Sequence, residues 1–352
     1  MKVAVLVSGG VDSAVALALL QEQGYDVTPF YLKIWLEDEL SFLGECPWEE
    51  DLSHAHAVCQ QLGLELQIVS LQQAYKELII SYTIDEIKAG RTPNPDMLCN
   101  TFIKFGAFLE NHGQGFDKIA TGHYAGIIKS DGAYFLKLTP DPIKDQTYFL
   151  ARLSQEQLSR VLFPLADLNK EQVRMHAQRF DLPNKDRKDS QGLCFLGKIK
   201  FRDFVKAQVG VQEGALIEYE TGKVLGKHEG FWFYTTGQRQ GLGLAGGPWY
   251  VVAKDPIKNT VTISKEYHGK DKQRNAFLMD IIQGKVCDYV GKPIQVKLRH
   301  GAQLYDATIK PAEGSRLLVT ISERDQGIAP GQFAVFYDGL VCVGSGMIVK
   351  TL

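Results

Sequence analysis

The chain has 352 residues, of which 45% are hydrophobic and 23% charged, and its formal net charge is −2. This length exceeds the size at which one hydrophobic core usually keeps growing, so we expect two or three domains. The charge balance excludes a globally basic protein, so any RNA binding requires basic residues gathered locally. No apolar run approaches about 18 residues and no signal-like segment is visible, so we expect a cytoplasmic protein without membrane contact.

The cysteines indicate neither a zinc site nor a thioredoxin-type site. They are sparse, and no two of them form a C-x-x-C pair. In a reducing compartment we expect them to be thiols unless their chemistry requires otherwise. The six residues are Cys46, Cys59, Cys99, Cys194, Cys287 and Cys342.

The most informative stretch lies near the start of the chain. Residues 3–7 are apolar and rich in valine, which predicts a buried strand, and an Ala/Leu-rich helix then runs to Gly24. Between them, residues 8–13 read Ser-Gly-Gly-Val-Asp-Ser. Small side chains let backbone N–H groups approach an anion at the positive end of the helix, so we predict a phosphate-binding loop. The spacing and lysine of a Walker A loop are absent.

Further strands are predicted at residues 27–35, 66–70 and 118–122, with helical patterns between them. This alternation predicts an α/β fold with a doubly wound parallel sheet, whose ligands bind at the carboxyl ends of the strands. Leu32, Lys33 and residues 121–123 follow predicted strands, so we expect them to line a nucleotide crevice.

A metal site between the second and third strands is disfavoured. His54, His56 and Cys59 suggest ligands, but residues two apart on a helix face different ways. Cys59 instead falls on an apolar stripe with Leu52 and Ala55, so we predict that it is a core residue.

A second dense stretch covers residues 90–100. Asn94 suits a helix N-cap and Pro95 the first helical position, and Gly113 is expected to end the helix. Asp96 and Cys99 are three residues apart in its first turns. A helix N-terminus lowers the pKa of a thiol, so Cys99 could be a reactive thiolate if exposed, with Asp96 as proton acceptor. A half-buried structural cysteine is the alternative. The predicted apolar face comprises Leu98, Phe102, Phe105 and Leu109.

Two later segments are polar and rich in turn residues. Lys144, Asp145 and Gln146 lie in a proline-rich turn, which suits either contact with a polar partner or a solvated turn. Cys194 lies in a glycine-flanked loop rich in lysine and arginine, which favours a thiolate on a loop that can move.

From about residue 201 the pattern changes to short β-strands. Residues 216–219, 231–235, 249–254 and 260–264 predict a small β-rich central domain. Residues 295–299, 307–310 and 316–322, with a hairpin over 333–343 turned at Asp338-Gly339, predict a C-terminal barrel or sandwich. Basic and aromatic residues here suit either RNA contacts or an ordinary surface. They are Arg239, Lys297, Arg299, His300, Phe231, Trp232 and Tyr234.

Taken together, these stretches resemble the tRNA-specific 2-thiouridylase family of PP-loop ATP pyrophosphatases along essentially the whole chain. The matching motifs are SGGVDS at 8–13, NPD-x-x-C at 94–99, TGHYA at 121–125, KDQ-x-YFL at 144–150, DS-x-G-x-CF at 189–195 and TTGQR-x-GLG at 235–243. The resemblance implies a transferase that uses ATP, with magnesium as its counter-ion, to adenylate the C2 oxygen of a wobble uridine in tRNA. Sulfur then replaces that oxygen, and AMP and pyrophosphate are released.

The resemblance also assigns residues to roles. By position, the resemblance makes Cys194 the carrier of the persulfide, Cys99 the partner nucleophile that attacks it, and Asp96 the base. That attack would liberate sulfide or leave a Cys99–Cys194 disulfide. The implied ATP-binding residues are Leu6, Val7, Ser8, Gly9, Gly10, Val11, Asp12, Ser13, Leu32 and Gly122. The implied RNA contacts are Asn94, Pro95, Asp96, His123, Lys144, Asp145, Gln146, Arg299, His300 and Gln332.

The expected organisation is a PP-loop catalytic domain over residues 1–200, a β-rich central domain over 201–271 and a tRNA-contacting β-barrel over 272–352. The expected partners are tRNA and a cysteine desulfurase or sulfur-carrier protein, and we expect a monomer. Two alternatives stay open: another PP-loop enzyme, such as an amidotransferase-type synthetase or a lysidine-type tRNA ligase, and an RNA-binding module without catalysis. His300-Gly301 departs from the Tyr-Arg usual in the family.

Overall fold

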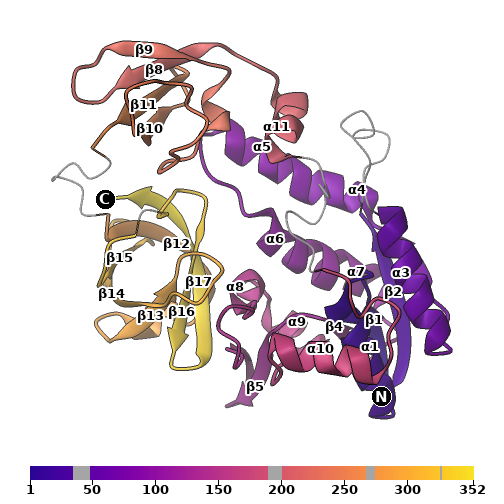
Figure 1. Ribbon diagram of the computed structural model, residues 1–352. Coiled ribbons are helices and arrows are strands. Elements are labelled where there is room, and N and C mark those ends of the chain that lie inside the picture. The colour runs from indigo at the N-terminus through magenta and orange to yellow at the C-terminus, as the bar shows by residue number, and fades with distance from the viewer. Residues whose placement is uncertain (35–47, 189–199, 267–273, 326) are drawn as a thin grey trace.

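The computed structural model describes residues 1–34, 48–188, 200–266, 274–325 and 327–352. Figure 1 shows three β-structures: a parallel sheet at the N-terminal end, a small central sheet and a C-terminal barrel. The predicted fold class is therefore confirmed. No helix among the described residues is long and apolar enough to cross a membrane.

The N-terminal sheet has the order β3-β2-β1-β4-β7, and its neighbouring strands are all parallel. Four of these strands confirm the predicted ones, whereas the two-residue β7 was not predicted. The strands are β1 (Lys2–Leu6), β2 (Asp26–Lys33), β3 (Gln67–Ser70), β4 (Lys118–Thr121) and β7 (Val161–Leu162).

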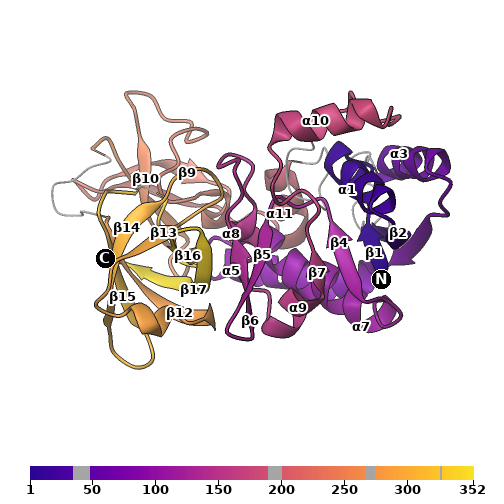
Figure 2. The ribbon, with the colours of Figure 1, turned by 90° about the horizontal axis from the view of Figure 1, so that it is seen from below.

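Helices cover both faces of this sheet because side chains alternate along β1. Val3 and Val5 enter one apolar core, and Ala4 and Leu6 enter the other. The first core is covered by α1 (Val11–Glu22), α3 (Trp48–Gln61) and α10 (Lys170–Arg179), which lie on one side of the sheet in Figure 2. Cys59 is 1% exposed in this core, as predicted.

The opposite face is covered by two long helical runs and two short helices. The first run comprises α4 (Gln72–Tyr75), the π-helix η2 (Lys76–Ile80) and α5 (Ser81–Lys88). The second comprises α6 (Pro95–Leu98), the π-helix η3 (Cys99–Ala107) and α7 (Phe108–His112), and the short helices are α8 (Thr147–Leu150) and α9 (Gln155–Arg160).

The central sheet has the order β10-β11-β8-β9. Its elements are α11 (Phe201–Val209), β8 (Gly214–Glu218), β9 (Val224–His228), the 3-10 helix η4 (Phe231–Phe233), β10 (Tyr250–Asp255) and β11 (Thr260–Ser264). The strand predicted at 231–235 is wrong. The Tyr234 N–H donates to the Phe231 carbonyl at 3.1 Å, and the aromatic side chains there fill a small core instead of alternating.

The C-terminal barrel closes because the long strand β17 pairs with β16 on one side and with β12 on the other. The predicted hairpin is confirmed, and Gly339 at its turn has φ +56°. The elements are β12 (Ala276–Gly284), the 3-10 helix η5 (Val286–Tyr289), β13 (Ile294–Lys297), β14 (Tyr305–Pro311), β15 (Leu317–Ile321), β16 (Phe333–Asp338) and β17 (Val341–Thr351).

One hairpin crosses between the N-terminal part and the barrel. Strands β5 (Gly126–Ser130) and β6 (Ala133–Lys137) follow the parallel sheet in sequence, but β6 pairs with the start of β17. Asp131 and Gly132 form its turn with φ +50° and +78°. The Asp-Gly pair is a sequence signal for such a turn that we did not use. The barrel is therefore hydrogen-bonded directly to the N-terminal part.

Candidate functional site

The loop at residues 8–13 follows the carboxyl end of β1, as predicted. Its shape is held by its own serines: the Ser8 N–H donates to Ser13 Oγ at 3.1 Å, and Ser13 Oγ donates to the Gly10 carbonyl at 3.0 Å. Gly10 caps α1 without a side-chain hydrogen bond. The first N–H groups of a twelve-residue helix therefore lack a side-chain acceptor at the cap, which is the arrangement that binds an anion.

Two glycines allow close backbone packing around this loop. Gly9 has φ +72°, and a Cβ there would lie 2.2 Å from the Asp51 carbonyl oxygen in α3. A Cβ on Gly122, after β4, would lie 2.6 Å from the Ser13 nitrogen. Both positions therefore require glycine, and the loop is clamped between the start of α3 and the end of β4.

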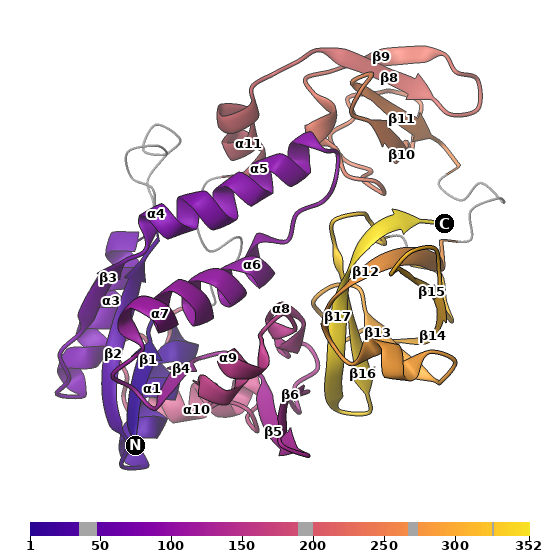
Figure 3. The same cartoon turned by 180° about the vertical axis from the view of Figure 1, so that it is seen from behind.

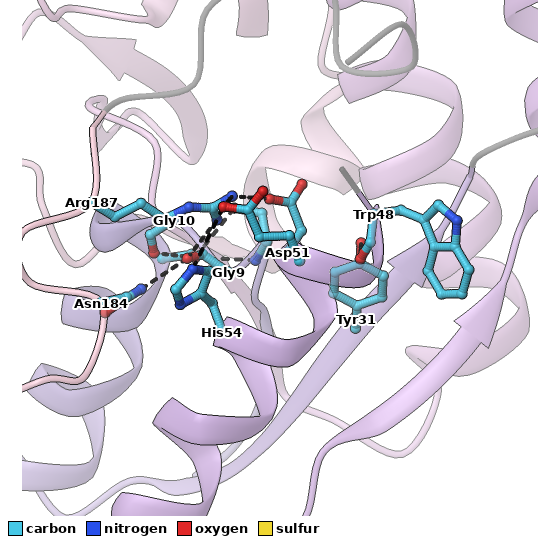
Figure 4. Close-up of polar contacts among 11 residues, drawn as sticks. Gly9, Gly10, Tyr31, Trp48, Asp51, His54, Asn184 and Arg187 are labelled. Atoms are coloured by element: carbon cyan, nitrogen blue, oxygen red, sulfur yellow. Dashed lines mark hydrogen bonds and ion pairs between the residues drawn. The ribbon is translucent and has the colours of Figure 1, made fainter. Parts of the chain in front are cut away.

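Cationic and polar side chains from the end of the N-terminal part close around the same loop. Asn184 donates to the Gly9 carbonyl at 2.9 Å, and Arg187 donates to the same oxygen at 3.0 Å and pairs with Asp51. Figure 4 shows Asn184 and Arg187 reaching Gly9 from one side and α3 from the other. The sequence analysis missed both residues, although Arg187 lies in the basic segment that precedes Cys194.

Asp12 is the acidic member of the loop and is held by two partners. Lys170, the first residue of α10, donates to Asp12 Oδ1 at 2.7 Å, and the Tyr124 hydroxyl donates to the same oxygen at 2.9 Å. No sequence signal pointed to Lys170, because its approach to Asp12 depends on how α10 packs on α1.

Lys33, at the end of β2, lies 4.5 Å from the centre of the Trp48 ring.

The remaining predicted nucleotide residues occupy the same edge of the sheet. Leu6 and Val7 are buried, with 7% and 5% exposure, so they can offer a ligand only backbone groups. Leu32 is half-buried near the end of β2, and Gly122 follows β4. The structure therefore brings the predicted nucleotide-binding residues together at the carboxyl edge of the sheet.

The helix that begins at Pro95 confirms the predicted cap. Asn94 Oδ1 accepts from the Met97 N–H at 3.2 Å, and Pro95 occupies the first helical position. Cys99 is 1% exposed and Asp96 is half-buried. The thiol is therefore shielded from solvent in this conformation, and the condition for a reactive, exposed thiolate is not met.

The apolar face predicted for this helix is partly wrong. From Cys99 onward the chain makes wide π-helical turns, which change the angular spacing of side chains. Phe102, predicted in the face, is 36% exposed, whereas Ile103 and Phe108 are fully buried. A 3.6-residue period therefore fails here, at a place where π-turns often accompany functional sites.

His123 is enclosed by aromatic rings. Its imidazole lies 6.3 Å from the Phe105 ring and 6.1 Å from the Phe163 ring, and its Nδ1 is 2.7 Å from the Thr121 hydroxyl. Burial, with a smaller contribution from Lys104, holds the pKa of His123 well below its usual value. The ring is neutral at pH 7 and can bind RNA by hydrogen bonding but not by charge.

The predicted RNA contacts at residues 144–146 divide between surface and core. Lys144 and Gln146 are half-buried, and Gln146 Oε1 accepts from the Tyr124 N–H at 3.0 Å. Asp145 is 1% exposed and forms an ion pair with the equally buried Lys297 at 3.0 Å. The buried Asp145 carboxylate therefore joins α8 to the barrel, and a contact between Asp145 and RNA stays a prediction.

Other predicted RNA contacts come from the barrel and lie in the same region, the joint, where α8 and the segment before Asn94 meet the barrel. Gln332 donates to the carbonyls of Thr92 and Pro93, both at 3.1 Å. The His300 ring stacks on Phe149 at 5.0 Å, and the exposed Arg299 pairs with Asp325. The barrel therefore contacts the segment that precedes Asn94, although the two lie more than 200 residues apart in the sequence.

The Tyr148 hydroxyl completes this joint. It lies 3.3 Å from the Leu298 carbonyl, 3.2 Å from the Phe333 carbonyl and 3.5 Å from Asn94 Nδ2. Burial raises the pKa of Tyr148, so the phenol stays protonated and can donate. Figure 3 shows α8 between α6 and the barrel, where these contacts form.

Two predicted residues, Cys194 and Cys46, lie outside the described residues. Among the residues that are described, no three His, Cys, Asp or Glu side chains gather as a metal site. Burial raises the pKa of Cys59 to about 11, which suits its place in the core.

Comparisons with known proteins agree with this geometry along the chain. Three family models match in succession: the tRNA methyl transferase HUP domain over residues 1–198, the tRNA methyl transferase PRC-barrel domain over 202–265 and the aminomethyltransferase beta-barrel domain over 290–348. The tRNA-specific 2-thiouridylase MnmA of Parabacteroides distasonis is 45% identical, with 99% of each chain covered. The tRNA-specific 2-thiouridylase MnmA 1 of Bacteroides thetaiotaomicron is 46% identical, over 99% of this chain and 100% of its own. The tRNA-specific 2-thiouridylase MnmA of Porphyromonas gingivalis is 44% identical, again with 99% of each chain covered.

Proposed function

Because the chain belongs to the tRNA-specific 2-thiouridylase family, we propose that it uses ATP to replace the C2 oxygen of a wobble uridine in tRNA with sulfur. The observation that carries the proposal is that these relatives are 44% to 46% identical to the chain, in alignments that cover at least 99% of each protein. It is supported by a loop in which Gly9 cannot be replaced without displacing the backbone of Asp51. The proposed organisation is a catalytic domain over 1–200, a central domain over 201–271 and a barrel over 272–352.

The loop residues bind and orient the nucleotide. Backbone N–H groups of residues 8–13 would hold the β- and γ-phosphates, and Arg187 and Lys170 are cations that contact this loop. Uridine O2 would then attack the α-phosphate, and pyrophosphate would leave. Adenylation turns a poor leaving group into AMP, which is a good one. No acidic cluster of described residues is built to hold a metal, so magnesium would bind mainly through phosphate oxygens. There it would neutralise charge on the departing pyrophosphate.

Two thiols would carry the sulfur. Cys194 would receive a persulfide from a cysteine desulfurase or sulfur carrier, and Cys99 would attack Cys194 Sγ and release hydrosulfide, which adds to C2 and expels AMP. If the terminal persulfide sulfur instead adds to C2 and expels AMP first, attack by Cys99 on Cys194 Sγ would break the S–S bond and leave the sulfur on the base. Either route ends in a Cys99–Cys194 disulfide, which an external thiol must reduce. Asp96 would accept the proton of Cys99.

The proposed RNA contacts are Asn94 to Asp96, His123, Lys144 to Gln146, Arg299, His300 and Gln332. Asn94 is fixed by the helix cap and by Tyr148, so the segment that meets the target base is held in place before RNA binds. We propose that a monomer suffices and that the protein acts on cytoplasmic tRNA.

The test is a reaction with unmodified tRNA, ATP, magnesium and a persulfide donor, analysed by nucleoside mass spectrometry. We expect 2-thiouridine in the wild type and none in Cys194→Ser. Cys287→Ser is the matched control, because Cys287 is an exposed thiol of the barrel and should retain full activity. AMP release with a base modification that lacks sulfur would instead indicate another PP-loop enzyme. Binding of tRNA without AMP release would indicate a module without catalysis.

A further inference from the structure

Arg152 lies where the N-terminal part and the barrel meet. It follows α8, and its guanidinium carbon is 5.3 Å from the centre of the Phe102 ring in η3 and 5.5 Å from that of Phe333 in β16. Figure 3 places α8 beside both α6 and β17. The guanidinium is therefore held against two aromatic rings, one 36% exposed and the other fully buried.

Among the described residues, no hydrogen-bond acceptor contacts this cation. Its Nε is buried without a hydrogen-bond partner, and within the described chain Arg152 has neither a carboxylate nor a carbonyl as partner. Other half-buried arginines differ, since Arg187 pairs with Asp51 and Arg174 donates to two carbonyls. Burial lowers the pKa of Arg152, although the group stays charged at any physiological pH. A half-buried cation without a counter-charge loses part of its hydration, so this position favours an external anion.

The residues around Arg152 also contact or adjoin residues 92–99, which include the proposed target-base segment at 94–96. Arg152 interacts electrostatically with Tyr82, whose hydroxyl is 3.4 Å from the Asn94 nitrogen. Phe333 directly follows Gln332, whose amide donates to Thr92 and Pro93. Phe102 is three residues beyond Cys99 on the same helical run. Arg152 thus lies close to the segment that contains Asn94, and it belongs to none of the residue sets that the sequence assigned.

We propose that Arg152 binds a backbone phosphate of the substrate RNA beside the target nucleotide. This inference rests on the proposed function, which brings a tRNA to Asn94. A planar guanidinium can donate two parallel hydrogen bonds to one phosphate. The two aromatic rings restrict the position of the guanidinium in advance, so less side-chain entropy is lost on binding.

The first test measures binding of an unmodified tRNA transcript over a range of salt concentrations by fluorescence anisotropy. We expect Arg152→Gln to bind roughly ten- to a hundredfold more weakly, because a charge-assisted contact is lost. The slope of log K against log salt should fall by roughly 0.7 to 1. Lys2→Gln removes the same charge at the exposed amino edge of the sheet, opposite the loop, and should leave both quantities unchanged.

The second test locates the phosphate. An anticodon stem-loop RNA carrying a neutral methylphosphonate on either side of the target uridine should bind the wild type more weakly. One of the two should bind Arg152→Gln no more weakly than unmodified RNA does, because the contact is already absent. Additive losses at both positions would overturn the proposal.

Further readouts separate the possible failures. Wild-type protein that does not bind tRNA would refute the proposed function itself. Wild-type binding with unchanged affinity and slope in Arg152→Gln would refute only the role of Arg152. If Arg152→Gln instead loses ATP–pyrophosphate exchange and keeps RNA affinity, the anion is a nucleotide phosphate and the proposal is wrong. Thermal unfolding of Arg152→Gln should match the wild type, which distinguishes a binding cation from a structural one.

Discussion

Replacing Gly9 by alanine should destabilise the N-terminal part far more than the same change at a glycine with similar backbone angles. Gly9 and Gly63 have φ +72° and +69°, but a Cβ on Gly63 meets nothing within 4 Å. Left-handed backbone costs an alanine about 1–2 kcal/mol relative to glycine, and both variants bear this cost. Only Gly9→Ala adds a steric clash.

The size of that clash follows from the geometry. The new Cβ would lie 2.2 Å from the Asp51 carbonyl oxygen, so the start of α3 must move by about 1.2 Å to restore an ordinary contact. A backbone atom cannot rotate away as a side chain can, and overpacking of this kind costs about 1–3 kcal/mol. The movement also strains the pair between Asp51 and Arg187. We therefore expect Gly9→Ala to lose about 2–5 kcal/mol and Gly63→Ala about 1–2 kcal/mol.

The assay is urea unfolding with and without ATP. ATP should raise the unfolding midpoint of the wild type and of Gly63→Ala, because a ligand that binds only the folded state stabilises it. It should have little effect on Gly9→Ala. Gly10→Ala, at φ −78° with 3.4 Å to Ser8 Oγ, should be close to the wild type in stability without ATP. If Gly9→Ala and Gly63→Ala lose the same free energy of unfolding, within about 0.5 kcal/mol, the backbone of α3 does not restrict residue 9 as the geometry indicates.

Three further outcomes follow from the structure. Lys297→Met should lower the free energy of unfolding by about 3–5 kcal/mol, because it leaves the Asp145 carboxylate buried without its cation; a loss below about 1 kcal/mol in urea unfolding would contradict this. Alkylation at pH 8, followed by peptide mass spectrometry, should label Cys287 in the native protein and spare Cys59 and Cys342, since burial raises their pKa values to about 11 and about 12; rapid labelling of Cys342 would show that the joint opens. Because the pKa of His123 is lowered in the folded protein, the unfolded chain binds a proton at this histidine at a higher pH than the folded chain does. The contribution of the neutral ring to stability is therefore present above about pH 6.5 and is lost as the pH falls below it. Between pH 7.5 and 5.5 the wild type should lose about 1.4 kcal/mol more than His123→Gln, and an equal loss in both would show that His123 titrates normally.

The sequence predicted those parts of the molecule whose causes are local. Valine-rich runs became the central strands of the parallel sheet, and Asn94 followed by Pro95 became a capped helix start. The conformation of the loop at residues 8–13 was also predictable, because it depends on adjacent small residues and on the helix that follows. In each case, the residues that determine the conformation lie within about one turn or one strand of each other.

The parts that could not be predicted depend on distant partners. Asp145 lies in a polar, proline-rich turn, and only its pairing with Lys297, 152 residues away, explains its burial. Lys170 and Arg187 reach the loop because α10 and the segment after it fold back over α1. The π-helical turns after Cys99 changed which aromatic side chains are buried, since a 3.6-residue period does not apply to them.

The joint between α8 and the barrel links the stability of the protein to the geometry of the proposed target-base segment. Tyr148 contacts two barrel carbonyls and Asn94, and Gln332 contacts the two residues that precede Asn94. A barrel that only extended the RNA-binding surface would not need buried hydrogen bonds to this segment. These contacts instead make the position of Asn94 depend on the docked barrel, so a substitution in the joint should weaken nucleotide modification even where RNA binding persists. The barrel thereby acts as part of the site, although its residues lie about 200 positions from the helix that they hold.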